Sequence, residues 1–148
     1  MEINKECLKD KAQYLLIFVP MLAVYLPTTL YPVTDQVGSD VSFRPPGYVF
    51  AIVWPILLLL LGISWFVRRK NGFFINSIYS ILCLLLAVWF ILYDTNKYLG
   101  LADIIICFFI TVFLFFYKLK PFNKKATLTL VPLAIWLIFA SILNIYSI

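Results

Sequence analysis

The chain consists of long apolar runs separated by short polar segments. Five runs reach about 18 or more mostly apolar residues, and roughly 20 residues at 1.5 Å per residue cross a hydrocarbon layer of about 30 Å. The runs are continuous and do not alternate between apolar and polar residues, which favours helices over the strands of a membrane barrel. The pattern predicts an all-α membrane protein with helices at about 13–31, 47–67, 73–93, 100–117 and 126–148.

One connecting segment, residues 32–46, is much longer than the others. It contains turn-forming residues and two aspartates and has little apolar periodicity. Directly after it, Pro46 suits the start of a helix, where its missing N–H costs nothing, and Gly47 permits close backbone approach. We expect a single domain over 1–148 in which this segment forms a lid loop.

Composition and charge support a membrane protein and suggest its orientation. Hydrophobic residues make up 64% of the chain, and the mean hydropathy is +0.98. With five spans, only two basic residues, Arg44 and Lys97, fall on the side opposite the N-terminus. The others share its side: Lys5, Lys9, Lys11, Arg68, Arg69, Lys70, Lys118, Lys120, Lys124 and Lys125. Basic loops concentrate on the cytoplasmic side, so we expect a cytoplasmic N-terminus, an outside C-terminus and no nucleic-acid partner.

The unusual side chains within the spans gather in the half of the bilayer beneath the long loop. Trp54, Trp89 and Asp103 all lie near that end of their predicted helices. In the last helix, Pro132, Trp136, Ala140 and Asn144 recur every four residues and share one face, flanked by Phe139 and Leu143. Indoles beside a small residue and a few polar groups predict a flat, mostly apolar pocket.

Each of these residues also has a simpler interpretation. A tryptophan near a membrane boundary is often an interfacial belt residue, which we expect for Trp65. Asp103 is a functional candidate, because an ionisable side chain at membrane depth is costly. Alternatively it lies in the first turn of its helix, where the helix N-terminus stabilises a carboxylate. Arg44 is either a solvated loop charge or a partner for an anionic group, and Asn144 suits a hydrogen bond between helices.

The absence of histidine limits the chemistry that the chain can perform. The chain contains no histidine, the residue that most often serves as a general base, a metal ligand or a haem ligand. We expect no metal site and no required cofactor, and we find no acid–base pair or nucleophile constellation for ordinary turnover.

Several motifs resemble the TspO/MBR family, also called translocator protein or tryptophan-rich sensory protein. They are RPPGYVFAIVW ending at Trp54, VW at Trp89, LAD at Asp103, and VPLAIWLIFASILN over 131–144. The resemblance implies a five-helix bundle, commonly dimeric, that binds tetrapyrroles such as protoporphyrin IX or haem under the first extramembrane loop. It implies that Pro45, Pro46 and Gly47 shape the helix start, that Asp103 occupies the family's acidic position, and that the cavity is lined by Trp54, Trp89, Trp136, Phe139, Ala140 and Leu143.

Three functions remain open from the sequence. The first is a porphyrin-binding translocator or sensory protein, in which Arg44 or loop amides meet propionates. The second, also suggested by the resemblance, is light-dependent porphyrin degradation, in which Trp54 and Trp136 would act as redox-active indoles. The third is a carrier of sterol or other lipid.

Overall fold

The computed structural model describes residues 11–31, 38–117 and 124–148. Within these ranges the chain is helical and contains no strand. The elements are η1 (Tyr14–Phe18), α2 (Val19–Leu30), α3 (Gly47–Arg68), α4 (Phe73–Thr95), α5 (Lys97–Phe116), α6 (Lys124–Leu128) and α7 (Val131–Tyr146). In the described part of the chain, five segments are long and apolar enough to cross a membrane, which confirms the predicted five-helix membrane architecture. Residues 32–37 of the predicted lid loop lie outside the described ranges, as do Lys5, Lys9, Lys118 and Lys120.

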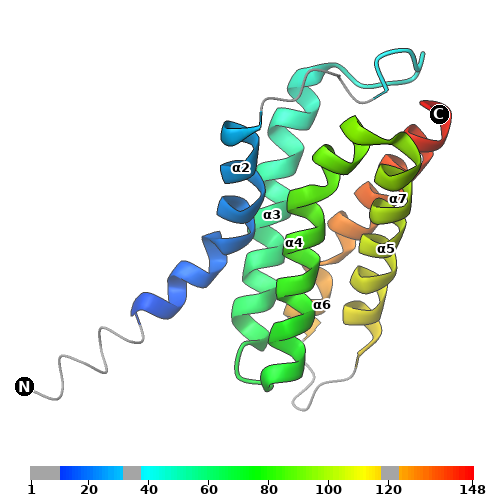
Figure 1. Ribbon diagram of the computed structural model, residues 1–148. Helices are drawn as coiled ribbons and strands as arrows, with labels where there is room; N and C mark the ends of the chain where they lie inside the picture. The colour runs from blue at the N-terminus through cyan, green and yellow to red at the C-terminus, as the bar shows by residue number, and fades with distance from the viewer. Residues whose placement is uncertain (1–10, 32–37, 118–123) are drawn as a thin grey trace, which may run out of the picture.

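The helices form an upright bundle whose two ends differ in chemistry (Figure 1). Residues 38–46 and the C-terminus lie at one end, which we call the loop end. The α3–α4 turn and α6 lie at the other, which we call the basic end because Arg69, Lys70, Lys124 and Lys125 are there. The helices α3, α4, α5 and α7 surround a core of leucines with Tyr79 and Ile104, whereas η1 leans away from the bundle axis.

The first span contains a 3₁₀ segment, η1, between helical residues 11–13 and α2, and is not one continuous α-helix over 13–31 as the sequence predicts. Pro20 has no N–H, so it cannot donate to the carbonyl four residues earlier. The preceding turn, η1, is accordingly wound as a 3₁₀ helix, and α2 begins at Val19 with Pro20 in its first turn. At η1 the chain approaches α3 so closely that a Cβ on Gly62 would lie 2.6 Å from the carbonyl carbon of Ile17.

Two other helix boundaries differ from the sequence prediction. The fourth span begins at Lys97 and not at Gly100, because the Asn96 side chain caps it by accepting a 2.9 Å hydrogen bond from the N–H of Tyr98. The fifth span is interrupted between Leu128 and Val131. Pro132 cannot donate to Leu128, and Leu130 closes a tighter turn onto Thr127 at 3.1 Å.

Arg68 is not a loop charge, contrary to the sequence interpretation. It is the last residue of α3 and is only 2% exposed. Its guanidinium donates at 2.6 Å to the Leu114 carbonyl in the last turn of α5 and at 2.7 Å to the Thr127 hydroxyl in α6. Because the carbonyls at a helix C-terminus carry partial negative charge, they compensate this buried cation.

Ser64 extends this polar network to a fourth helix. Its hydroxyl donates to the Ala126 carbonyl at 2.7 Å and therefore accepts from the Tyr79 hydroxyl, also at 2.7 Å. Arg68, Ser64 and Tyr79 together join α3, α4, α5 and α6 at the basic end. The network fixes the helices there, away from the loop end where the candidate site lies.

Candidate functional site

Three tryptophans from three helices meet near the loop end of the bundle. The Trp54 ring centroid in α3 lies 6.3 Å from that of Trp89 in α4 and 6.4 Å from that of Trp136 in α7. The planes of Trp54 and Trp136 are nearly perpendicular, at 82°. Residues 82 positions apart in the sequence thus share one aromatic cluster, as the sequence predicts.

Other aromatic rings continue the cluster on both sides. Phe50 packs edge-on against Trp136 at 5.6 Å, and Phe139 lies 5.2 Å from the same ring. Tyr93 lies 6.0 Å from Trp89. Edge-to-face and tilted ring pairs at these distances stabilise a structure by more than the burial of their apolar area. The rings therefore form one packed aromatic wall.

The described part of the loop closes onto this wall. Gly38, whose φ of +68° favours glycine, donates its N–H to the Tyr93 hydroxyl at 3.3 Å. It also sits against Leu143, because a Cβ there would lie 2.9 Å from the Leu143 Cδ1. The loop is therefore held to both α4 and α7.

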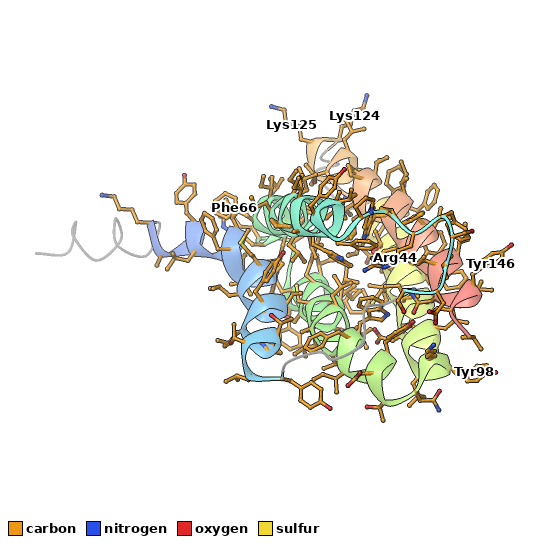
Figure 2. All side chains as sticks on the ribbon, turned by 90° about the horizontal axis from the view of Figure 1, so that it is seen from above. Arg44, Phe66, Tyr98, Lys124, Lys125 and Tyr146 are labelled. Atoms are coloured by element: carbon orange, nitrogen blue, oxygen red, sulfur yellow. The ribbon has the colours of Figure 1, made fainter. Side chains whose placement is uncertain are left out.

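Arg44 reaches from the loop toward the cluster. Its guanidinium carbon lies 5.1 Å from the Phe50 ring centroid, and its Nη1 donates to the Pro45 carbonyl at 3.5 Å. Figure 2 shows Arg44 over the interior of the bundle, whereas Tyr98 and Tyr146 project outward. The side chain is half-buried, so Arg44 is not a fully solvated loop charge.

The predicted helix start after the loop is confirmed. Pro46 is the N-cap of α3 with an extended ψ of 150°, and Gly47 is the first helical residue. The expected close backbone approach at Gly47 is not found, because an added Cβ there would meet nothing within 4 Å. Pro45 precedes them and directs the chain into the helix, because a residue before proline is restricted to extended conformations. The RPPG stretch thus fixes the direction from which Arg44 meets the cluster.

Three polar atoms of this region are buried with no hydrogen-bond partner among the described residues. They are the indole nitrogens of Trp89 and Trp136 and the side-chain oxygen of Asn144. A buried polar group left unpaired costs about 1–3 kcal/mol. Of these atoms, the two indole nitrogens belong to the tryptophan cluster. Buried polar groups in native proteins are usually hydrogen-bonded, so unpaired ones call for an explanation.

A cavity of about 160 Å³ opens beside the cluster. Trp54, Leu86, Trp89 and Phe90 line it from α3 and α4, and Val24, Tyr25 and Thr28 line it from α2. Of the six residues predicted to line the cavity, Trp54 and Trp89 do so, whereas none of the four on α7 does: Trp136, Phe139, Ala140 and Leu143. Ala140 and Leu143 are buried instead. The roles of these residues in ligand binding remain predictions.

Asp103 is buried, but not in the first turn of its helix. Since α5 begins at Lys97, the carboxylate lies in the second turn, beyond the reach of the helix N-terminus. The interpretation of Asp103 as a first-turn carboxylate stabilised by the helix N-terminus is therefore wrong. Its one hydrogen-bonding neighbour among the described residues is the Cys107 thiol, 4.0 Å away. No such bond joins Asp103 to a tryptophan within the described chain, and its functional role stays a prediction.

Two further interpretations are corrected. Trp65 is not an interfacial belt residue: it is 7% exposed, stacks on Tyr79 at 5.8 Å, and donates to the Asn76 side chain at 2.8 Å. Asn144 does not link two helices through a described hydrogen bond, because its amide nitrogen donates to the Ala140 carbonyl of its own helix at 2.7 Å.

Sequence reasoning missed several residues of the site, among them Phe50, Tyr93, Gly38 and Tyr25. Phe50 and Tyr93 lie four positions before Trp54 and four after Trp89, on the same helix faces, and this spacing was a usable signal. Gly38 and Tyr25 come from elements whose pairing with the cluster no local pattern shows. Their placement depends on how the helices pack.

Comparison with known proteins agrees with this architecture. The model of the TspO/MBR family matches residues 16–148. The "Tryptophan-rich protein TspO" of Archaeoglobus fulgidus is 32% identical over 111 residues, which cover 69% of this chain and 69% of that protein. A match over all five spans, with a tryptophan cluster at the loop end, places the chain in the TspO/MBR family of membrane proteins.

Proposed function

We propose that the protein binds a tetrapyrrole, such as protoporphyrin IX or haem, against the tryptophan cluster beneath the loop. The observation that carries this proposal is the pair of unpaired, buried indole N–H groups of Trp89 and Trp136. A tetrapyrrole offers ring nitrogens and carboxylates that accept hydrogen bonds, and a flat face that stacks on indoles. Arg44, over Phe50, is placed to meet a carboxylate of such a ligand.

Binding requires the site to widen. Pockets for drug-sized ligands enclose about 300–1,000 Å³, whereas the cavity beside the cluster encloses about 160 Å³. The packing of α2 limits this cavity, because Val24, Tyr25 and Thr28 form one of its walls. The described part of the loop is held to α4 by the hydrogen bond from Gly38 to Tyr93. We infer that the loop or α2 moves outward when the ligand enters.

The test is a titration of the purified protein with protoporphyrin IX in the dark, with the Trp136→Phe variant in parallel. The variant keeps an aromatic ring but loses the indole N–H and part of the stacking area. We expect its dissociation constant to rise about tenfold, or about 1.4 kcal/mol. The porphyrin's own absorbance is the readout, because removing a tryptophan changes the protein's fluorescence.

Trp65→Phe is the matched control, since it removes an indole that lies outside the cluster. Its affinity should equal that of the unmodified protein. Equal weakening in both variants, or no saturable binding at all, would refute the proposed site. If light causes a loss of porphyrin absorbance with the unmodified protein but not with Trp136→Phe, the degrading enzyme is favoured. If the protein binds sterol with an affinity that Trp136→Phe does not change, the lipid carrier is favoured.

We further propose that the basic end faces the cytoplasm. An odd number of spans puts the termini on opposite sides, and Arg69, Lys70, Lys124 and Lys125 are at the end where the N-terminal span begins. A phosphatase that is active only outside the cytoplasm should be active when fused to the C-terminus and inactive when fused to the N-terminus. The reverse pattern would overturn this orientation.

A further inference from the structure

A second groove lies at the basic end, between η1 and the α3–α4 turn. It encloses about 530 Å³ and is independent of the tryptophan cluster. Leu15, Leu16 and Val19 form an apolar wall, and Gln13, Arg69 and Lys70 form a polar end. No acidic side chain lines it among the described residues. Among the described residues, the groove therefore combines an apolar surface with two basic side chains and no acidic one.

Arg69 is held in place before any ligand arrives. Its Nε donates to the Gln13 side chain at 2.8 Å, its Nη1 donates to the Phe66 carbonyl at 2.7 Å, and its guanidinium stacks 3.8 Å from the Phe66 ring centroid. Asn76 fixes the turn by donating to the Arg69 and Gly72 carbonyls, both at 2.9 Å. A cation ordered in this way loses little conformational entropy when it binds an anion.

Lys70 supplies a second cation to the groove. It is exposed, and within the described residues its ammonium makes no hydrogen bond or ion pair. Arg69 and Lys70 come directly after Arg68, the last residue of the membrane span formed by α3. The positive charge thus lies at the depth where lipid headgroups meet the hydrocarbon layer, and the leucines of η1 lie on its hydrocarbon side.

We propose that this groove binds the headgroup of an anionic phospholipid, with Arg69 and Lys70 on the phosphate and an acyl chain along Leu15 and Leu16. Basic pockets between membrane helices recognise anionic headgroups by this charge complementarity. A soluble anion would use the cations alone and would leave the apolar wall bare. Leu15 is 65% exposed, which is a surface that an acyl chain covers.

The test compares phosphatidylglycerol with phosphatidylcholine on the purified full-length protein, with retained lipid counted by native mass spectrometry. We expect the unmodified chain to retain phosphatidylglycerol preferentially. Lys70→Gln should lower its affinity about fivefold, as expected for one cation near an anionic headgroup, and phosphatidylcholine retention should not change. Arg69→Gln should lower it by at least as much.

Lys124→Gln is the matched control, because it removes one exposed lysine from the same end of the bundle but outside the groove. It should retain phosphatidylglycerol like the unmodified protein. Equal losses in Lys70→Gln and Lys124→Gln would show a diffuse charge effect and overturn the site. The proposal would also be overturned if inorganic phosphate displaced more lipid than chloride does at the same ionic strength. That result would indicate a site for free phosphate. Melting temperatures of all variants verify that Lys70→Gln leaves the fold intact.

Discussion

Replacing Arg68 with glutamate should prevent stable assembly of the bundle. The substitution puts a carboxylate against the Leu114 carbonyl and the C-terminal end of α5, where Arg68 now donates a 2.6 Å hydrogen bond. Thr127 would lose its charged partner as well. A buried charge without compensation costs about 3–5 kcal/mol, which is a large share of the stability of most domains. We expect a strongly lowered melting temperature in detergent, or protein recovered only as aggregate.

Lys70→Glu is the control for this prediction. It makes the same change of charge two residues later, at an exposed side chain. Its melting temperature should stay close to that of the unmodified protein. Similar melting of the two variants would show that the network around Arg68 does not hold the basic end together.

Replacing Gly62 with alanine should loosen the first membrane span. The added Cβ would lie 2.6 Å from the carbonyl carbon of Ile17 and 2.9 Å from its Cα. These are backbone atoms, so no change of side-chain rotamer relieves the overlap and η1 has to move away from α3. Overpacking of this kind costs about 1–3 kcal/mol. Small residues at such contacts let membrane helices approach closely, where packing replaces the hydrophobic effect.

Gly47→Ala is the matched control, because it lies on the same helix and its added Cβ would meet nothing within 4 Å. Gly62 lies in the helix interior, where exchange for alanine gains roughly 1 kcal/mol of helix propensity, and Gly47 at the first helical position gains less. A lower stability of Gly62→Ala than of Gly47→Ala therefore reports the overlap. Gly62→Ala should have the lower melting temperature and faster hydrogen exchange in residues 14–30. Equal exchange in the two variants would contradict the contact.

The spans were predictable because membrane burial requires long, uninterrupted apolar runs. The α3 boundaries differ from the predicted 47–67 by one residue, since a proline and a glycine mark its start and Arg68 its end. The breaks were harder to predict. Pro20 and Pro132 are visible in the sequence, yet whether a proline kinks, tightens or interrupts a helix depends on which neighbouring groups satisfy the freed carbonyls.

The tryptophan cluster was predictable for a different reason. Once five spans are accepted, alternation of direction fixes the depth of every residue, and Trp54, Trp89 and Trp136 fall at one level. Depth alone does not give the rotation of a helix about its axis. For this reason the sequence did not predict that Trp65 packs inside, or that Arg68 is buried while Arg69 and Lys70 are not.

The position of α2 beside the tryptophan cavity determines which ligand concentration sets the occupancy of the site. Val24, Tyr25 and Thr28 form its outer wall, Tyr25 is 38% exposed, and only 6% of the most apolar window of the first span is buried inside the bundle. This wall therefore faces the acyl chains, and a hydrophobic ligand dissolved in the bilayer reaches it sideways. The concentration that sets occupancy is then the mole fraction of ligand among lipids. At a fixed total amount of ligand, diluting the protein's membrane with more lipid should empty the site even though the aqueous volume is unchanged.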